Sequence, residues 1–391
     1  MADYDAIVLG TGGVGSAALH HLARRGFKVV GLDRFGPAHG LGSSHTGTRM
    51  IRLAYFEHPE YVPLLRRAFV QWEELQDRRH EQLYRQVGLV EVGPPEGELV
   101  TGILRAAALH ELDVESLDAA TARRRFGGYA LGAGQVAVFE RRAGILAVEA
   151  CVLAHLHEAS EAGAELRTGV AVLDWRTDGE GVEVTTDSGT VRADRLVVAA
   201  GPWAGQVLAD IGLDLRVLRK PVFWFGADPA VYGVEAGCPM FIFETGRGTF
   251  YGFPALDGTV KVGEHTGGEL VGDPLAVDRA ERPSDRAAVA AFLADHLPGV
   301  DLRPVRHEVC MYTCTPDGHF VVDVHPDAPQ VCFAAGLSGH GFKLAPVLGE
   351  ALADLAVDGS SDLPIAFLGM HAAGRGALTR PRRDGAAGPS L

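Results

Sequence analysis

The pattern of apolar and polar positions is most regular in the first 33 residues of the chain. Residues 6–9 form a short apolar run typical of a buried strand. A glycine-rich segment over 10–15 follows, and residues 16–25 carry small and apolar side chains at helical spacing. A second apolar run over 28–32 is closed by Asp33. This order predicts a strand–helix–strand unit.

The glycine-rich segment has the spacing GxGxxG, and an acidic residue follows its last glycine by 18 positions. Gly10 permits a tight turn, Gly12 lets the backbone approach a pyrophosphate, and Gly15 lets helix and strand pack closely. The N-terminus of the helix offers free N–H groups to phosphates, and Asp33 can accept hydrogen bonds from a ribose. We predict a dinucleotide site, against the alternative of a glycine turn in an unrelated α/β protein. The motif does not choose between NAD and FAD.

Two later patterns resemble further parts of such a site. Residues 182–191 read as a hairpin that leads into an apolar strand over 196–200. The glycine-rich stretch 336–343 precedes a helical pattern over 347–355. Because these features recur near the start, middle and end of the chain, we expect three separated segments to hold one ligand, with a second domain inserted between them.

The sequence also predicts the main elements of that second domain and of the helices around it. Strands are expected over 87–92, 241–243 and 259–262. Helical spacing connects Leu65 with Trp72. It also connects Val148, Val152 and Leu156. From Gly374 onward the chain is rich in Gly, Ala, Arg and Pro without apolar periodicity, which predicts a disordered tail over 374–391.

Composition narrows the class of protein. A length of 391 residues suggests two domains, and 47% hydrophobic with 22% charged residues excludes wholesale disorder. The net charge of −14, without a long Lys/Arg run, argues against a nucleic-acid partner. No apolar run reaches the roughly 18 residues that a membrane span needs. Five irregularly spaced cysteines do not form a disulfide framework, so a cytoplasmic protein is expected.

Six stretches in order give the chain a specific resemblance. It is similar, over residues 4 to 360, to the monomeric sarcosine oxidase and N-methyltryptophan oxidase family of FAD-dependent amine oxidases. The stretches are 10–33, 42–52 (GSSHTGTRMIR), 251–254 (YGFP), 261–265 (KVGEH), 309–313 (VCMYT) and 336–343 (GLSGHGFK).

The resemblance implies an α/β fold, α+β overall, with a Rossmann-like FAD-binding domain and a second catalytic domain built on a mostly antiparallel sheet. The FAD-binding domain is expected to be discontinuous and the catalytic domain to fill its two gaps. The expected boundaries are 1–85, 145–215 and 315–373 for the first domain, and 86–144 and 216–314 for the second.

The resemblance also implies covalent FAD, joined to the sulfur of Cys310. A thioether tether needs a thiolate near the flavin, whereas Cys151 and Cys332 read as buried structural cysteines. Cys314 lies four residues after Cys310, but no second Cys/His pair with zinc spacing accompanies it, so no metal is predicted.

Further roles follow from the same resemblance. Arg52 and Lys343 match a carboxylate-binding pair, in which Arg offers a planar fork and Lys a point charge. Lys261 matches a lysine that promotes the reaction with O2, because a fixed cation stabilises developing superoxide. The remaining expected site residues are His45, Arg49, Ser43, Thr48, Gly339 and Gly341 around the flavin, and Tyr251, His265 and Tyr312 in the pocket. His20 and His21 match nothing catalytic and are expected to be partly exposed.

Four positions depart from the family pattern. Ser44 stands where the commonest form has histidine, and Thr46-Gly47 where it has Gly-Asp; relatives acting on cyclic secondary amines also carry a serine at the first place. Ile242 stands where the sarcosine enzymes tend to have methionine. These departures loosen the assignment of the substrate.

The resulting expectation is a monomeric flavoprotein oxidase that demethylates sarcosine or another N-methyl amino acid, with O2 reduced to H2O2 and release of formaldehyde and the primary amino acid. The alternatives within the same chemistry are N-methyltryptophan and a cyclic amino acid such as pipecolate or proline. An NAD-dependent dehydrogenase and a non-catalytic flavin-binding subunit are the alternatives from other classes.

Overall fold

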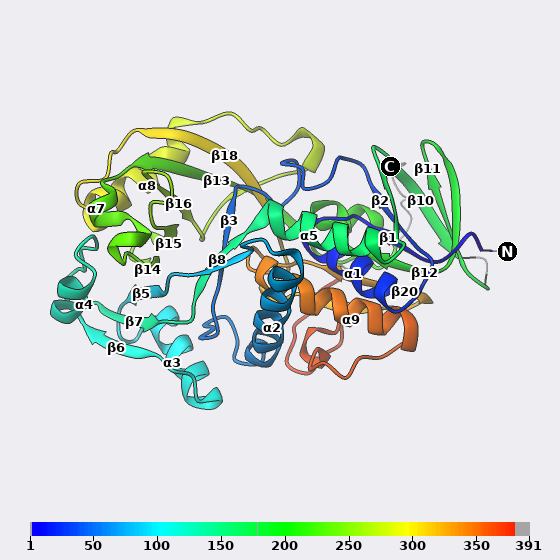
Figure 1. The fold of residues 1–391 in the computed structure, drawn as a ribbon, viewed down its shortest axis with the longest axis horizontal. Coiled ribbons are helices and arrows are strands. Elements are labelled where there is room, and N and C mark those ends of the chain that lie inside the picture. Colours follow the sequence, from blue (N-terminus) through cyan, green and yellow to red (C-terminus); the bar gives the residue numbers. More distant parts are fainter. Residues whose placement is uncertain (1, 178, 380–391) are drawn as a thin grey trace.

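The computed structural model describes residues 2–177 and 179–379, which form an elongated molecule with two lobes (Figure 1). Each lobe is built around its own large sheet, of eight and of nine strands. The lobe that holds the N-terminus contains the eight-stranded sheet, and the other lobe contains the nine-stranded one (Figure 1).

The eight-stranded sheet is built on the predicted strand–helix–strand unit. β1 (Tyr4–Leu9) pairs in parallel with β2 (Val29–Asp33) and with β12 (Gly189–Val198). The apolar residues of β1 and β2 are buried, as a strand covered on both faces requires. The other strands are β9 (Glu165–Thr168), β10 (Val172–Thr177), β11 (Val182–Thr186), β19 (Val321–His325) and β20 (Ala328–Ala335).

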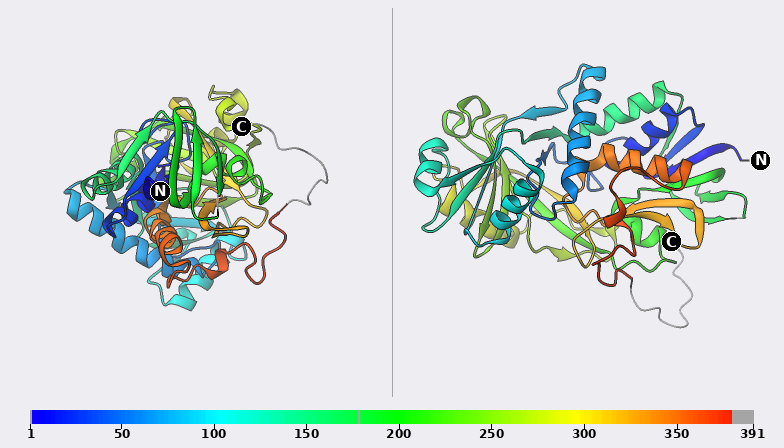
Figure 2. Two further views of the ribbon diagram at one scale, coloured as in Figure 1. Left: turned by 90° about the vertical axis from the view of Figure 1, so that its right-hand side faces the viewer. Right: turned by 90° about the horizontal axis from the view of Figure 1, so that it is seen from below.

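Three helices lie side by side over this sheet (Figure 2): α1 (Gly13–Arg24), α5 (Val148–Glu161) and α9 (Ala345–Asp358). The helices α1 and α9 approach closely, since a Cβ on Gly349 would lie 2.5 Å from the Cβ of Ala17. This packing corrects the prediction for His20, which is only 2% exposed because its ring lies in the helix interface, 5.7 Å from the ring of His155. His21 is partly exposed, as predicted.

The nine-stranded sheet is antiparallel except where β14 (Met240–Thr245) pairs in parallel with β5 (Leu89–Gly93). Two long strands, β13 (Arg216–Gly226) and β18 (Pro304–Cys314), pair along almost their whole length. Its remaining strands are β6 (Glu115–Asp118), β7 (Val136–Glu140), β15 (Gly248–Phe253), β16 (Thr259–Glu264) and β17 (Glu269–Leu270). The helix α8 (Pro283–His296) packs Phe292 onto its aromatic core.

A small three-stranded sheet lies between the lobes (Figure 1). It consists of β3 (Thr48–Ile51), β8 (Gly144–Ala147) and β4 (Tyr84–Gln86). Further helices are α2 (Tyr61–Arg79), α3 (Glu98–His110), α4 (Ala119–Arg125), α6 (Ala204–Val207) and α7 (Pro229–Tyr232). In the described ranges, no helix combines the length and apolar character needed to cross a membrane.

The expected fold class is confirmed: a Rossmann-like unit in one lobe and a mostly antiparallel sheet in the other. The predicted hairpin is confirmed as β11 and β12. Groups of strands from the two large sheets alternate along the chain. The exact domain boundaries stay a prediction.

The tail prediction is wrong for its first residues. The side chain of Arg375 is 4% exposed and donates to both carboxylate oxygens of Asp317, and Leu378 is also 4% exposed. The peptide carbonyl of Leu378 accepts a hydrogen bond from Asp214 N at 2.7 Å. Residues 374–379 therefore pack onto the fold, and 380–391 lie outside the described residues.

Candidate functional site

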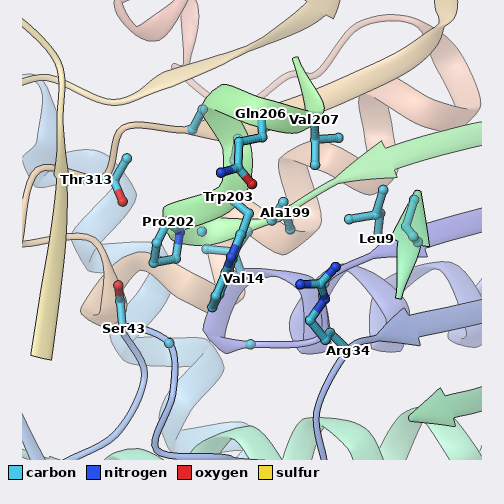
Figure 3. A pocket seen from close by; sticks show the side chains of 18 of the residues that line it. Leu9, Val14, Arg34, Ser43, Ala199, Pro202, Trp203, Gln206, Val207 and Thr313 are labelled. Atoms are coloured by element: carbon cyan, nitrogen blue, oxygen red, sulfur yellow. The ribbon is translucent and has the colours of Figure 1, made fainter. Parts of the chain in front are cut away.

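A cavity of about 1290 Å³ runs along the eight-stranded sheet and is lined by segments from the start, middle and end of the chain. Figure 3 shows Ser43 and Thr313 on one side of it and Leu9 and Arg34 on the other, with Trp203 between them. The lining includes five of the predicted glycine and acidic positions: Gly10, Gly12, Asp33, Gly339 and Gly341.

The glycines of the first loop are required by close backbone contacts. A Cβ on Gly15 would lie 1.8 Å from the carbonyl oxygen of Gly10, and one on Gly10 would lie 2.6 Å from that of Ala199. Gly10 also has a φ of +85°, a conformation that favours glycine. By contrast, a Cβ on Gly12 would meet only Ser44 Oγ, at 3.7 Å, so this glycine faces open space. The loop is thus shaped to bring bare backbone against a ligand in the cavity.

Asp33 braces the loop as well as lining the cavity. Its Oδ2 accepts hydrogen bonds from the backbone N of Thr11 at 2.8 Å and from Thr11 Oγ1 at 3.0 Å. Its Oδ1 accepts from the backbone N of Phe35. A carboxylate has about four lone-pair sites, so one remains for a ribose hydroxyl. The length of the cavity, the glycine-rich loop and this carboxylate fit the adenosine diphosphate half of FAD.

The other end of the cavity meets a small pocket of about 70 Å³ beneath the nine-stranded sheet. Arg49, Tyr312, Gly339 and Phe342 line both spaces. The small pocket is also lined by Met50, Arg52, Phe56, Glu57, Ile242, Thr249, Tyr251, Phe253, His265, His340 and Lys343. The two sites are therefore adjacent, as a substrate beside a flavin ring would require.

Cys310 lies on β18, is buried and lines neither cavity, although its neighbours Met311 and Tyr312 line the long one. Arg49 Nη2 donates to its sulfur over 3.2 Å. Burial alone would raise the pKa of the thiol, but the charge of Arg49 and the neighbouring His45 imidazole lower it to about 7. Ser43 Oγ donates to the carbonyl of Met311, which ties the Ser43 loop to the strand that carries Cys310.

His45 is buried between this cysteine and Glu308. Its Nδ1 lies 3.3 Å from Glu308 Oε2, and its Nε2 is buried without a hydrogen-bond partner among the described residues. Burial acts to lower the pKa of His45, but Cys310 and Glu308 outweigh it and raise the pKa. His45 lines neither described cavity, so the structure places it against Cys310 and Glu308 and not against the ligand space.

Lys261 is buried under the loop that connects these residues. Its Nζ donates to the carbonyl of Thr46 at 2.7 Å and to that of Thr48 at 3.0 Å, and it lies within 3.1 Å of both hydroxyls. Burial, with the charge of Arg49, holds the pKa of Lys261 well below its usual value. The structure brings it to Thr48 and not into the lining of either described cavity.

Arg52 lines the small pocket and contacts the carboxyl groups of Glu57 and Glu91. Its Nη2 donates to both oxygens of Glu57, at 2.8 and 2.9 Å. Its Nε lies 3.3 Å from Glu91 Oε1. The guanidinium also lies 4.4 Å from the centre of the Tyr55 ring.

Lys343 enters the same pocket from the glycine-rich loop before α9. Its Nζ donates to the carbonyl of His340 at 2.9 Å and to Tyr55 Oη at 3.3 Å. Burial and the charge of Arg52 lower the pKa of Lys343 to about 7, against the opposing effect of Glu57. Arg52 and Lys343 thus share Tyr55 and one small pocket, while their role as a carboxylate-binding pair stays a prediction.

The wall of the pocket carries the other predicted residues. Tyr251 and Ile242 are opposite each other on β15 and β14. The ring of His265 lies 5.7 Å from that of Tyr312, and burial lowers the pKa of His265 to about 4. Tyr312 also contacts the glycine-rich loop, because a Cβ on Gly339 would lie 2.4 Å from its ring.

Four further side chains belong to this region and were missed: Tyr55, Glu57, Glu91 and His340. Tyr55 Oη lies 2.6 Å from His340 Nδ1. Glu91 is the one charged residue in the apolar run 87–92, and this was the signal that could have identified it. In residues 2–177 and 179–379, no cluster of His, Cys, Asp or Glu could hold a metal ion.

Comparisons with known proteins agree with this geometry. The family model described as FAD dependent oxidoreductase matches residues 5–355. A monomeric sarcosine oxidase of Streptomyces avermitilis is 40% identical over 368 residues, covering 93% of this chain and 96% of the relative. An N-methyl-L-tryptophan oxidase of Salmonella dublin is 35% identical over 364 residues, covering 93% and 97%.

A solved structure has the same architecture over nearly the whole chain. NikD, described as an unusual amino acid oxidase essential for nikkomycin biosynthesis, has a TM-score of 0.83 and 27% identity, with 94% of this chain and 98% of that chain covered. The chain therefore belongs to the FAD-dependent oxidoreductase family, in the branch of the amine oxidases.

Proposed function

We propose that the protein is a flavoprotein oxidase of small secondary amino acids, most simply sarcosine, with FAD joined to Cys310. The observation that carries this proposal is the pair of buried basic side chains, Arg52 and Lys343, in a small pocket beside the long cavity. The relative from Streptomyces avermitilis supports the choice of sarcosine.

The size of the pocket favours a small substrate. A volume of about 70 Å³ suits an amino acid without a large side chain. Ile242 and Phe253 are buried wall residues and Tyr251 is a partly buried one, so an indole ring would need them to move. N-methyltryptophan is thus the weaker candidate, whereas proline and pipecolate, which are compact, stay as the second candidate.

The residues of the pocket position the substrate. Arg52 and Lys343 bind its carboxylate, which orients the amine toward the long cavity. His265 is neutral at pH 7 because burial lowers its pKa to about 4, so it adds no charge that would repel a substrate amine. No side-chain base is required if the amine binds unprotonated.

FAD, when bound, supplies the acceptor for the two electrons and the hydrogen of the substrate C–H bond and passes them to O2. For sarcosine, the CH3–NH bond is oxidised to an imine, water releases formaldehyde and glycine, and O2 becomes H2O2. Lys261, held by Thr46 and Thr48, is the cation proposed to favour the reaction with O2.

Cys310 is suited to covalent attachment because its thiol ionises near neutral pH. Arg49 and His45 lower its pKa to about 7 against the effect of burial, so a substantial fraction is thiolate at pH 7. The pKa values of the other cysteines are raised instead; burial raises that of Cys332 to about 12, and burial outweighs the charge of Lys220 at Cys314.

A substrate screen tests the proposal. Purified holoenzyme is given sarcosine, N-methyltryptophan, proline and pipecolate at equal concentration, and H2O2 release is measured. We expect the highest kcat/KM for sarcosine and the lowest for N-methyltryptophan. A preference for proline or pipecolate would replace the first candidate with the second, and absence of peroxide with every amine would contradict the proposal.

A further inference from the structure

Glu91 is a buried acid in the middle of β5 that the proposed chemistry does not use. Its side chain is fully buried, and neither carboxyl oxygen has a hydrogen-bond partner among the described residues. It stands beside Ile242 of β14 in register. A buried carboxyl group without hydrogen bonds is costly when ionised, so its presence beside the pocket requires an explanation.

The charged group next to Glu91 is the guanidinium of Arg52. Glu91 Oε1 lies 3.3 Å from Arg52 Nε, without the alignment of a hydrogen bond, while Glu57 takes Nη2. The third nitrogen, Nη1, makes no hydrogen bond to any residue in 2–177 or 179–379, and Arg52 lines the pocket. Glu91 therefore lies against Nε of the guanidinium and Glu57 accepts hydrogen bonds from Nη2. Nη1 remains available to a ligand.

We propose that Glu91 is a positioning residue that holds Arg52 from behind and, by gaining or losing a proton, sets how strongly Arg52 binds a carboxylate ligand. The proposal rests on the proposed function in one respect, that Arg52 binds the substrate carboxylate.

The charges around Glu91 determine its protonation. Burial raises its pKa, the charge of Arg52 opposes this, and the carboxylates of Glu140 and Glu57 raise it further, to about 8. Lys343 adds a smaller opposing effect. The carboxylate of Glu140, on β7, has hydrogen-bond partners of its own, because it accepts from the backbone N of Leu53 and of Ala54.

The direction of the effect follows from these charges. Below about pH 8 Glu91 is neutral, so Arg52 faces the ligand with one neutralising carboxylate, Glu57. Above that pH Glu91 becomes a second carboxylate on the same guanidinium and competes with the ligand for its charge. Ligand binding and protonation of Glu91 thus favour each other, and by reciprocity the affinity for a carboxylate falls as Glu91 ionises.

The test measures the Kd of methoxyacetate, a carboxylate without an amine, for the holoenzyme by calorimetry between pH 6.5 and 9.5. Wild type is compared with Glu91→Gln, which keeps the shape and removes the charge. Both proteins lose affinity as Lys343 loses its proton with rising pH. The ratio of the two Kd values cancels this shared effect. We expect equal affinity near pH 6.5 and about tenfold tighter binding by Glu91→Gln at pH 9.5, within the range usual for coupled sites.

A parallel pH dependence in the two proteins, or weaker binding by Glu91→Gln at every pH, would overturn the proposal in favour of a purely structural role. If Glu91→Gln does not fold, proton uptake on binding to Lys343→Met is measured in buffers of different ionisation enthalpy at pH 8.5. Uptake supports the proposal and its absence contradicts it. Equal binding by wild type and Arg52→Ala would instead overturn the carboxylate site of the proposed function.

Discussion

The guanidinium of Arg49, which lines both cavities, donates a hydrogen bond to the sulfur of the buried Cys310 over 3.2 Å. This contact places a permanent cation on the one cysteine whose pKa falls, to about 7. It joins two segments that are 261 residues apart in the chain. The relationship makes Cys310 the expected point of flavin attachment.

Replacing Cys310 by Ser should leave FAD bound without a covalent link. After acid precipitation, the wild-type pellet is expected to stay yellow and the Cys310→Ser pellet to be colourless. Cys314→Ser is the matched control, because Cys314 is on the same strand four residues away and burial raises its pKa. A colourless wild-type pellet, or a colourless Cys314→Ser pellet with a yellow Cys310→Ser pellet, would contradict the assignment.

Replacing Arg49 by Met should slow covalent incorporation of FAD into the apoprotein. Loss of the charge raises the pKa of the thiol above about 7, so less thiolate is present at pH 7. We expect incorporation at pH 7 to slow by about fivefold for the first unit of pKa gained and by about tenfold for each further unit, with partial recovery as the pH rises toward 9. The measurement is the time course of acid-stable flavin, and a rate independent of pH in both proteins would argue against the thiolate.

Replacing Lys261 by Met should affect the half-reaction with O2. The substitution removes Nζ, which in its protonated form is the cation that would stabilise superoxide, although burial and Arg49 favour the neutral amine. We expect reoxidation to slow by about 100-fold or more, in line with the loss of one electrostatic contact at a reacting group, while anaerobic reduction by sarcosine changes little. Stopped-flow spectroscopy separates the two. Equal slowing of both half-reactions would point to a structural role under Thr46 and Thr48.

Replacing Ile242 by Ala should widen the pocket. The side chain is 6% exposed, so its truncation is expected to lower the free energy of unfolding by about 2–5 kcal/mol. The added space should lower KM for N-methyltryptophan relative to sarcosine. Val90→Ala is the control, because Val90 is buried on the adjacent strand outside the pocket lining. An unchanged ratio of kcat/KM for the two substrates would mean that Ile242 does not limit substrate size.

The buried His20 predicts acid-sensitive packing of the helices α1 and α5. Burial lowers the pKa of His20 to about 3 in the folded protein, whereas its value in the unfolded chain is near 6.5. Between these two pH values, the unfolded chain binds a proton that the folded protein does not bind. The free energy of unfolding therefore falls as the pH falls through this range. The loss approaches about 1.4 kcal/mol per pH unit. Thermal unfolding from pH 7 to 4.5 should show a shallower decline for His20→Leu than for wild type. Parallel declines would exclude His20 as the source.

The sequence predicted those features that depend on local spacing. The first strand–helix–strand unit follows from apolar periodicity and from glycines that close contacts require, such as Gly15 against Gly10. The resemblance supplied Arg52 and Lys343, which the structure places in one pocket. Their roles stay a prediction.

What the sequence could not predict depends on packing between distant segments. His20 looked like a surface residue because nothing in its own helix shows that His155 covers it. Arg375 looked like part of a disordered tail because its partner, Asp317, is 58 residues away. The interaction of Glu91 with Arg52 likewise requires the arrangement of β5 beside the pocket.

Arg52 and Lys343 are proposed to select a substrate by its carboxylate. The most direct measurement compares sarcosine with N-methylethylamine, which keeps the N-methyl group and lacks the carboxylate. The holoenzyme should release H2O2, formaldehyde and glycine in equal amounts from sarcosine and almost no H2O2 from the amine, and Arg52→Ala should reduce the difference. Similar kcat/KM values for the two compounds in the wild-type enzyme would contradict the account.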